Sequence, residues 1–284
     1  MQRHWIAGTA FALAAAVAAE VLGGRAFARL VRADVRALDS GAPRDEMRFV
    51  GEEMLVGLPE PVQRYLRFTG VVGKPFARRV HLRQTGRMQL GRGQPWIPLR
   101  AEQWYAVQPP GFVWDGTLFA GPVPLVRARD LYRAGKGHML IKAVSAFTVA
   151  DATGQELDQG EMMRYLNEMM WFPSAFLEGN VSFEPVDSTS ARVSLSDHGR
   201  RVTATMFFDA DGRLTEFVGQ RYAGGELETW SVPVVAYGEL AGMQLPTRCK
   251  AVWKYARGDQ EYIDVTVTEL DHHRVISDAC YSQR

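Results

Sequence analysis

Apolar and polar residues alternate along much of the chain from Arg79 onward, and this two-residue period restricts the fold more than any other feature of the sequence. Residues 202–208 read VTATMFF, and residues 263–268 read IDVTVT. Alternation of this kind is typical of strands that have one face in water and the other in a core. Turn signals such as Gly224-Gly225 separate the segments, which favours antiparallel hairpins. We therefore expect about ten strands.

One helical segment interrupts the strands and supplies a cover for the sheet. Residues 159–170, QGEMMRYLNEMM, are good helix formers, and we predict Asp158 as the N-cap with Glu161 in a capping box. A shorter helix is expected between Pro61 and Gly70. The predicted fold is mainly β (α+β): a curved antiparallel sheet or partly open barrel covered by one or two helices, plus an N-terminal hydrophobic helix. The apolar face of the longer covering helix consists of Met162, Tyr165, Leu166, Met169 and Met170.

The N-terminal segment, residues 5–24, is alanine-rich and mostly apolar. Twenty helical residues span about 30 Å, the hydrocarbon thickness of a bilayer. Three interpretations are open: a membrane anchor, a cleaved signal peptide, or a helix packed on the protein. Residues 24–38 continue as a basic amphipathic helix, which suits an anionic membrane surface. We favour a single membrane anchor and leave the side of the membrane open. The apolar face of the amphipathic part consists of Phe27, Leu30, Val31, Val35 and Leu38.

Charge and cysteine content exclude some classes and leave others open. The formal net charge is +1, so the sequence has no electrostatic footprint for nucleic acid. The two cysteines, Cys249 and Cys280, allow one disulfide, and whether they pair stays open. We divide the chain into an N-terminal membrane-directed helix (1–38), a linker with a short helix (39–56), a β-rich globular domain (57–272) and a C-terminal tail (273–284).

Methionine and aromatic side chains gather around the helix that begins near Asp158, and tryptophans recur in the strands. Methionine surfaces adapt to varied apolar ligands, so these residues could line a hydrophobic cavity. The commoner use of such residues is to fill the core between a helix and a sheet. The residues that we predict to contact a ligand are Trp104, Trp114, Met163, Met170, Trp171 and Phe176.

Catalytic patterns are weak in this sequence. Three carboxylates of the helical segment, Asp158, Glu161 and Glu168, could perform acid–base chemistry if burial shifted their pKa values. The alternative is a helix cap together with solvated ion pairs through Arg164. None of the six histidines stands at a metal-ligand spacing, and HExxH, CxxC, GxSxG and P-loop patterns are absent. We therefore predict no metal and no cofactor and, leaving the question of enzyme activity open, favour a role without catalysis.

Several segments resemble a bacterial and archaeal family that is known only as a domain of unknown function, often with an N-terminal membrane segment. The segments are LPEPVQRYLRFTG (58–70), AEQWYAVQPPGFVWD (101–115), LDQGEMMRYLNEMMWFP (157–173), LPTRCKAVWKY (245–255) and EYIDVTVTEL (261–270). This resemblance covers about residues 57–272 and implies no activity. A fainter, fold-level resemblance, around residues 203–222, is to LolA-like lipoprotein carriers. It implies a curved sheet with a helix in its hollow and lipid chains in the apolar interior.

Our leading interpretation is membrane-associated, non-catalytic binding of a lipid or other hydrophobic ligand. A membrane-tethered module that binds a protein partner is the first alternative, and it predicts a filled core and an apolar surface patch. A hydrolase or transferase that uses the carboxylates of helix 158–170 is the second. It predicts a polar cleft in which at least one of these groups has a raised pKa.

Overall fold

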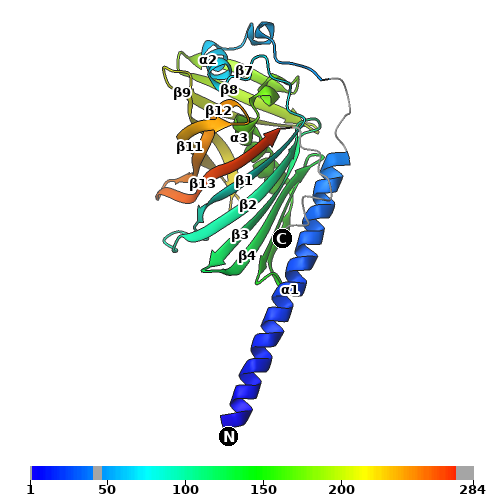
Figure 1. Ribbon diagram of the computed structural model, residues 1–284. Helices are drawn as coiled ribbons and strands as arrows, with labels where there is room; N and C mark the ends of the chain where they lie inside the picture. Colours follow the sequence, from blue (N-terminus) through cyan, green and yellow to red (C-terminus); the bar gives the residue numbers. More distant parts are fainter. Residues whose placement is uncertain (1, 41–46, 273–284) are drawn as a thin grey trace.

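A single 13-stranded antiparallel sheet dominates the computed structural model, which describes residues 2–40 and 47–272, with side chains from Glu20 onward (Figure 1). Thirteen strands exceed the expected ten, because the short outer strands β6 and β7 are largely exposed and lack a clear apolar phase. The strands are β1 (Arg79–Met88), β2 (Ile97–Ala106), β3 (Gly111–Ala120), β4 (Val123–Arg133), β5 (Lys136–Ala143), β6 (Phe147–Thr153), β7 (Val181–Asp187), β8 (Ser190–Asp197), β9 (Arg200–Phe208), β10 (Leu214–Ala223), β11 (Glu226–Leu240), β12 (Met243–Tyr255) and β13 (Gly258–His272).

The strand order places the first and last strands side by side in the middle of the sheet. The order is β6-β5-β4-β3-β2-β1-β13-β12-β11-β10-β9-β8-β7, so two meanders meet where β1 pairs with β13. The edge strands β6 and β7 are joined through α3 (Gln155–Glu168) and two 3-10 turns, Met169–Trp171 and Pro173–Leu177. The connection therefore has to pass from one edge of the sheet to the other. It does so across the face that we call the inner face, around which the sheet curves (Figure 1).

Helix α3 begins four residues earlier than its sequence predicts. Gly154 is the N-cap, and Asp158 lies within the helix, so the predicted capping box is wrong. The Asp158 carboxylate is buried and accepts hydrogen bonds from the backbone N–H of Gly137 (2.8 Å) and from Lys136 Nζ (3.0 Å). Arg200 Nη2 donates a third, at 3.1 Å. Asp158 thereby ties the start of α3 to β5 and β9.

The apolar side chains of α3 are buried in the main core, as predicted. Met162, Tyr165 and Met169 belong to a cluster that also includes Tyr65 of α2 (Glu60–Thr69). Helix α2 contains Pro61 in its first turn and ends at Gly70, whose φ of 72° suits glycine, so the short-helix prediction is confirmed. Of the linker helix expected within residues 39–56, the structure has the 3-10 turn Glu52–Leu55, and residues 41–46 lie outside the described part.

Helix α1 (Gln2–Ser40) lies on the opposite, outer face of the sheet, and its N-terminal part extends beyond the strands (Figure 1). Phe27, Val31, Val35 and Leu38 form a second core cluster with Trp104, Ala106, Val113, Leu131 and Leu140. The prediction that this apolar stripe lies on a membrane is therefore wrong for those four α1 residues; Leu30, by contrast, is 37% exposed.

Polar contacts add to the docking of α1. Asp39 forms an ion pair with Arg79, and Asp34 lies 3.4 Å from Arg129. Glu20 accepts a hydrogen bond of 2.7 Å from the Ser145 hydroxyl. Within the described residues, no helix combines the length and the apolarity that crossing a bilayer requires.

Candidate functional site

A cavity of about 370 Å³ lies between α3 and the inner face of the sheet. Its size falls within the range of about 300–1,000 Å³ that is usual for small-molecule sites. The strands β1, β3, β4, β5, β10, β11, β12 and β13 contribute to its walls. The apolar lining comes mainly from strands and includes Met88, Trp114, Leu118, Val126, Ile141, Trp230, Val232, Ala251, Trp253, Ile263 and Val265.

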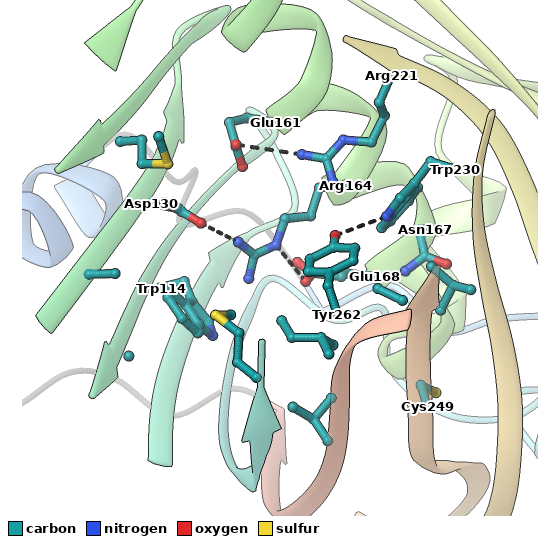
Figure 2. A pocket seen from close by; sticks show the side chains of 18 of the residues that line it. Trp114, Asp130, Glu161, Arg164, Asn167, Glu168, Arg221, Trp230, Cys249 and Tyr262 are labelled. Atoms are coloured by element: carbon teal, nitrogen blue, oxygen red, sulfur yellow. Dashed lines mark hydrogen bonds and ion pairs between the residues drawn. The ribbon is translucent and has the colours of Figure 1, made fainter. Parts of the chain in front are cut away.

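The wall that α3 contributes is polar along most of its length. Glu161, Arg164 and Glu168 fall on one side of the helix because residues three, four and seven apart lie over one another. Asn167 lies beside them, and Met170 and Trp171 continue the wall beyond the helix. The methionine and aromatic face of α3 thus packs into the core, while its charged face borders the cavity (Figure 2).

Three of the six residues predicted to contact a ligand line the cavity: Trp114, Met170 and Trp171. Trp104 lies on the outer face, in the cluster with α1, and its ring stacks on His81 at 5.3 Å. Met163 packs against Gly219 of β10, and Phe176 contacts the Tyr65 ring at 6.3 Å in the main core. A ligand-binding role for any of the six stays a prediction.

The alternation of the strands explains which side chains reach the cavity. In β3 and β4, the inward positions pair as Trp114 with Asp130 and Leu118 with Val126. A Cβ atom on Gly116 would collide with the Trp114 ring, so this glycine gives the ring space to lie against the strand. In β10, the inward positions are Phe217, Gly219 and Arg221.

Arg164 joins two carboxylates beside the cavity. Its Nη1 donates to Asp130 at 2.7 Å, and its Nε donates to Glu168 at 2.8 Å (Figure 2). Its guanidinium also lies 5.1 Å from the centre of the Trp114 ring. Burial acts to lower the pKa of Arg164, but the charges of Glu168, Asp130 and Glu161 outweigh it and raise the pKa above its ordinary value.

Glu168 is the best satisfied carboxylate of this wall. Besides the Arg164 bond, it accepts hydrogen bonds from Gln103 Nε2 at 2.7 Å and from the Tyr105 hydroxyl at 3.1 Å. Burial, followed by the charge of Glu168, raises the pKa of Tyr105 well above its usual value. Because all of these donors are directed at Glu168, its carboxylate is held in place as a structural hydrogen-bond partner.

Glu161 and Arg221 are only partly satisfied. Glu161 Oε1 lies 3.7 Å from Arg221 Nη2, which is an ion pair but too long for a hydrogen bond. Glu161 Oε2 and Arg221 Nε are buried and have no hydrogen-bond partner, and the same holds for Asn167 Oδ1. Burial, reinforced by the nearby charge of Asp130, raises the pKa of Glu161 to about 7. The Arg221 guanidinium lies over the Trp230 ring at 4.6 Å and near the Trp253 ring at 5.9 Å.

The three carboxylates singled out in the sequence therefore divide. Glu161 and Glu168 border the cavity, whereas Asp158 does not and is occupied by Lys136, Arg200 and a backbone N–H. The alternative of a solvated ion-pair face is wrong, because all three are buried. Within the described residues no cluster of His, Cys, Asp and Glu could hold a metal ion.

Cys249 also borders the cavity, and burial raises the pKa of its thiol far above the ordinary value, which disfavours the reactive thiolate. Cys280, the other half of the possible disulfide, lies outside the described residues.

Sequence reasoning missed Asp130, Arg221 and Asn167. For the first two a signal exists: each stands in the inward, otherwise apolar phase of its strand, at the position after Ala128 and Gly219 in the two-residue period. A charged residue in that phase indicates a buried polar site. For Asn167 no comparable signal exists, because the helix around it is polar on one side and apolar on the other.

Residues 48–265, more than half of the chain, match the family of unknown function DUF6544. This chain belongs to the DUF6544 family. The match confirms the family resemblance read from its sequence segments. No curated protein matches this DUF6544 member significantly in sequence.

Several solved structures share part of the arrangement of this DUF6544 member. A DUF1329 family protein from Desulfovibrio piger has a TM-score of 0.45 and 11% identity, over 78% of this chain and 96% of that one. An outer membrane lipoprotein-sorting protein domain from Vibrio parahaemolyticus has a TM-score of 0.41 and 8% sequence identity, over 82% of this chain and 96% of that one. A LolA superfamily protein from Nitrosomonas europaea has a TM-score of 0.40 and 10% sequence identity, over 78% of this chain and 96% of that one. The names of the last two agree with the fainter resemblance. Because all three scores lie below 0.5, the function of this chain has to be inferred from its own residues.

Proposed function

We propose that this protein binds a lipid or another hydrophobic ligand in the cavity between α3 and the sheet, at a membrane surface and without catalysis. The observation that carries the proposal is the cavity of about 370 Å³, whose strand-borne walls consist largely of apolar and aromatic side chains. Burying apolar ligand surface against such walls contributes about 25 cal/mol per Å². The alternative of a protein-interaction module predicts a filled core, which the cavity counts against.

Exposed apolar side chains support the membrane part of the proposal. The turns β1–β2, β3–β4 and β5–β6 lie at one end of the sheet, which we call the hairpin end. Val123, Val144 and Phe147 are exposed there, and so are Val21 and Leu22 of α1. Gly23 lies directly against Ser145 of the β5–β6 turn, which brings this part of α1 to the same end. An apolar patch of this kind is typical of surfaces that contact a partner or a lipid phase.

The cavity and the apolar patch occupy the same end of the sheet. Leu90, which follows β1 at the hairpin end, borders the cavity and is itself exposed. The N-terminal part of α1 also extends beyond this end (Figure 1). A ligand that leaves a membrane at the hairpin end would therefore reach the cavity over an apolar path.

The experiment is to purify the full-length protein in a mild detergent and to identify co-purifying lipids by mass spectrometry. A matched pair of variants localises any lipid. Ala128→Trp fills part of the cavity, because Ala128 lines it, whereas Val235→Trp adds the same side chain at an exposed position. We expect bound lipid in the wild type and in Val235→Trp, and a marked loss in Ala128→Trp. Equal lipid in both variants, or none in the wild type together with no uptake of a fluorescent fatty-acid probe, would reject the proposal.

A further inference from the structure

Resting on the proposed function, we infer that the ligand is an amphiphile with an anionic head group, which the cavity binds at the polar α3 wall through Arg221 while the apolar chain lies against the strands. The cavity is itself amphipathic. Its α3 wall carries Glu161, Arg164, Asn167 and Glu168, and its strand walls are largely apolar. A purely apolar ligand would leave the two unpaired oxygens of this wall, Glu161 Oε2 and Asn167 Oδ1, without partners, which costs free energy in a buried site.

Arg221 of β10 lies beside the α3 wall and has unused hydrogen-bonding capacity. The Nε atom of Arg221 is buried without a hydrogen-bond partner. Its Nη2 atom lies 3.7 Å from Oε1 of Glu161, which is too long for a hydrogen bond. The guanidinium carbon lies 4.6 Å from the centre of the Trp230 ring and 5.9 Å from that of the Trp253 ring, so both rings attract its charge. A planar guanidinium with free N–H groups is suited to a carboxylate or a phosphate.

Arg164, on the α3 wall, already has two carboxylate partners at hydrogen-bond distance. It makes hydrogen bonds of 2.7 Å and 2.8 Å to Asp130 and Glu168. The contrast between the two arginines identifies Arg221 as the one that a ligand can engage.

Two further buried atoms of the α3 wall have no hydrogen-bond partner. Glu161 is 3% exposed and Asn167 is 4% exposed, yet Oε2 of the first and Oδ1 of the second have no hydrogen-bond partner. Native proteins leave few buried polar atoms unpaired, so these atoms beside Arg221 indicate a polar group of a ligand. An anion can accept hydrogen bonds from Arg221 and from a protonated Glu161, whereas Asn167 Oδ1 is itself an acceptor and needs a donor group of the ligand. The polar part of an amphiphile would fill this place.

The charge of Glu161 decides which sign of head group fits. Asp130 and Glu168 carry two negative charges, and Arg164 and Arg221 carry two positive charges. These groups sum to zero while Glu161 is protonated and to one net negative charge once Glu161 is ionised. Burial raises the pKa of Glu161 to about 7, so an anion next to Arg221 would favour the protonated form further. The neutral carboxyl group then donates its proton in a hydrogen bond to the anion.

The other charged groups packed around Glu161 are already paired. Asp130 of β4 and Glu168 of α3 bind Arg164, while Lys136 of β5 and Arg200 of β9 bind Asp158. On β6, Asp151 pairs with His138 at 2.7 Å. Anion binding is therefore expected to weaken as pH rises through about 7, because Glu161 then becomes charged and repels the head group.

Ligands that share one chain and differ in the head group test the inference. Laurate, methyl laurate and dodecyltrimethylammonium carry an anionic, a neutral and a cationic head, and butyrate supplies the anionic head without the long chain. Binding to the full-length protein is measured by calorimetry or by quenching of tryptophan fluorescence between about pH 6 and pH 8. We expect laurate to bind about tenfold more tightly than methyl laurate at the acidic end of this range, with butyrate not measurable.

Arg221→Met removes the charge while keeping an apolar side chain of similar length. It is expected to lower the affinity for laurate to that for methyl laurate and to leave methyl laurate unchanged. Arg192→Met is the matched control, because Arg192 pairs with Glu184 on the exposed side of β8. If circular dichroism shows that Arg221→Met does not fold, Arg221→Lys replaces it, with an intermediate loss expected. The wild-type ligand series stands independently of either variant.

The possible failures are distinguishable. If methyl laurate or dodecyltrimethylammonium binds as tightly as laurate, or if folded Arg221→Met keeps the preference for laurate, the head-group inference is wrong while the proposed function stands. If butyrate binds as tightly as laurate, the site takes small anions and not amphiphiles. If no long-chain ligand binds, the proposed function fails and this inference with it.

Discussion

The sulfur atom of Met163 lies over the Cα atom of Gly219, at the place where any other residue would carry its side chain. A Cβ atom on Gly219 would be 2.7 Å from this sulfur. Helix α3 and strand β10 thus approach each other so closely that one of them has to lack a side chain at the contact. Gly219 of β10 is that position. The contact sets how closely α3 lies against β10 beside the cavity.

Gly219→Ala is expected to destabilise the protein by about 1–3 kcal/mol, because the new methyl group overpacks the contact with Met163. The double variant Gly219→Ala, Met163→Ala should show favourable coupling, since the shortened side chain removes the clash. Urea unfolding measures both effects. Gly179→Ala is the control, because a Cβ atom there would meet nothing within 4 Å. Equal destabilisation at positions 179 and 219 would contradict the close approach.

Asp158→Asn is expected to lower the free energy of unfolding by about 1–3 kcal/mol. The amide cannot supply the charge that holds Lys136 and Arg200, and both of these partners keep some access to water, which limits the cost. Glu184→Gln removes a carboxylate from an exposed pair with Arg192 and should change stability by less than about 0.5 kcal/mol. Thermal unfolding of both variants measures the difference. A neutral Asp158→Asn would show that Asp158 does not tie α3 to the sheet.

The fold class followed from the sequence because alternation is a local property of each strand. Residues 202–208, for example, lie in β9 with Val202, Ala204, Met206 and Phe208 buried, in the predicted phase. The strand order was not predictable, because the pairing of β1 with β13 joins Leu82 to Leu270, and no local pattern encodes a partner so far away. The stripe on α1 was assigned to a membrane because sequence alone cannot tell a lipid surface from the outer face of a sheet.

The stability of the protein is expected to fall as pH rises from about 4.5 to about 7, because of Glu161. Burial raises the pKa of this group from 4.5 to about 7, so in this range the folded protein holds a proton that the unfolded chain has released. One pKa unit corresponds to about 1.4 kcal/mol, so the loss amounts to about 3 kcal/mol at most. Urea unfolding across this range measures it. In Glu161→Gln the free energy of unfolding should change less with pH over this range. An unchanged pH dependence in this variant would mean that other groups cause it.

Val35→Asp is expected to release α1 from the outer face, since Val35 is 0% exposed and packs in the cluster with Trp104 and Val113. A buried, unpaired carboxylate there costs several kcal/mol, more than the docking of one helix can offset. Trypsin then cuts faster at the arginines of residues 25–36. Leu30→Asp places the same charge at an exposed position of α1 and should leave the cleavage rate near that of the wild type. Similar rates for the two variants would contradict the docking.

The polar wall was less predictable than the sheet for a physical reason. Glu161 and Glu168 were recognised as a pair on one helix face, but their sequence gave no indication of burial, because the same spacing is usual on a solvated helix. Burial arises from the passage of α3 between two edges of the sheet, which depends on the whole topology. The partners that complete the wall, Asp130 and Arg221, come from strands on opposite sides of that helix.

The central position of the β1–β13 pair has a consequence for how the chain matures. During synthesis, the meander β1–β6 leaves the ribosome first, but its strand β1 stays an open edge until residues 258–272 have been made. Closure of this seam is a long-range event and is therefore slow compared with hairpin formation. A chain that stops before Gly258 would expose two unpaired central strands, β1 and β12, and we expect such a product to aggregate or to be degraded even though it keeps every residue of α3.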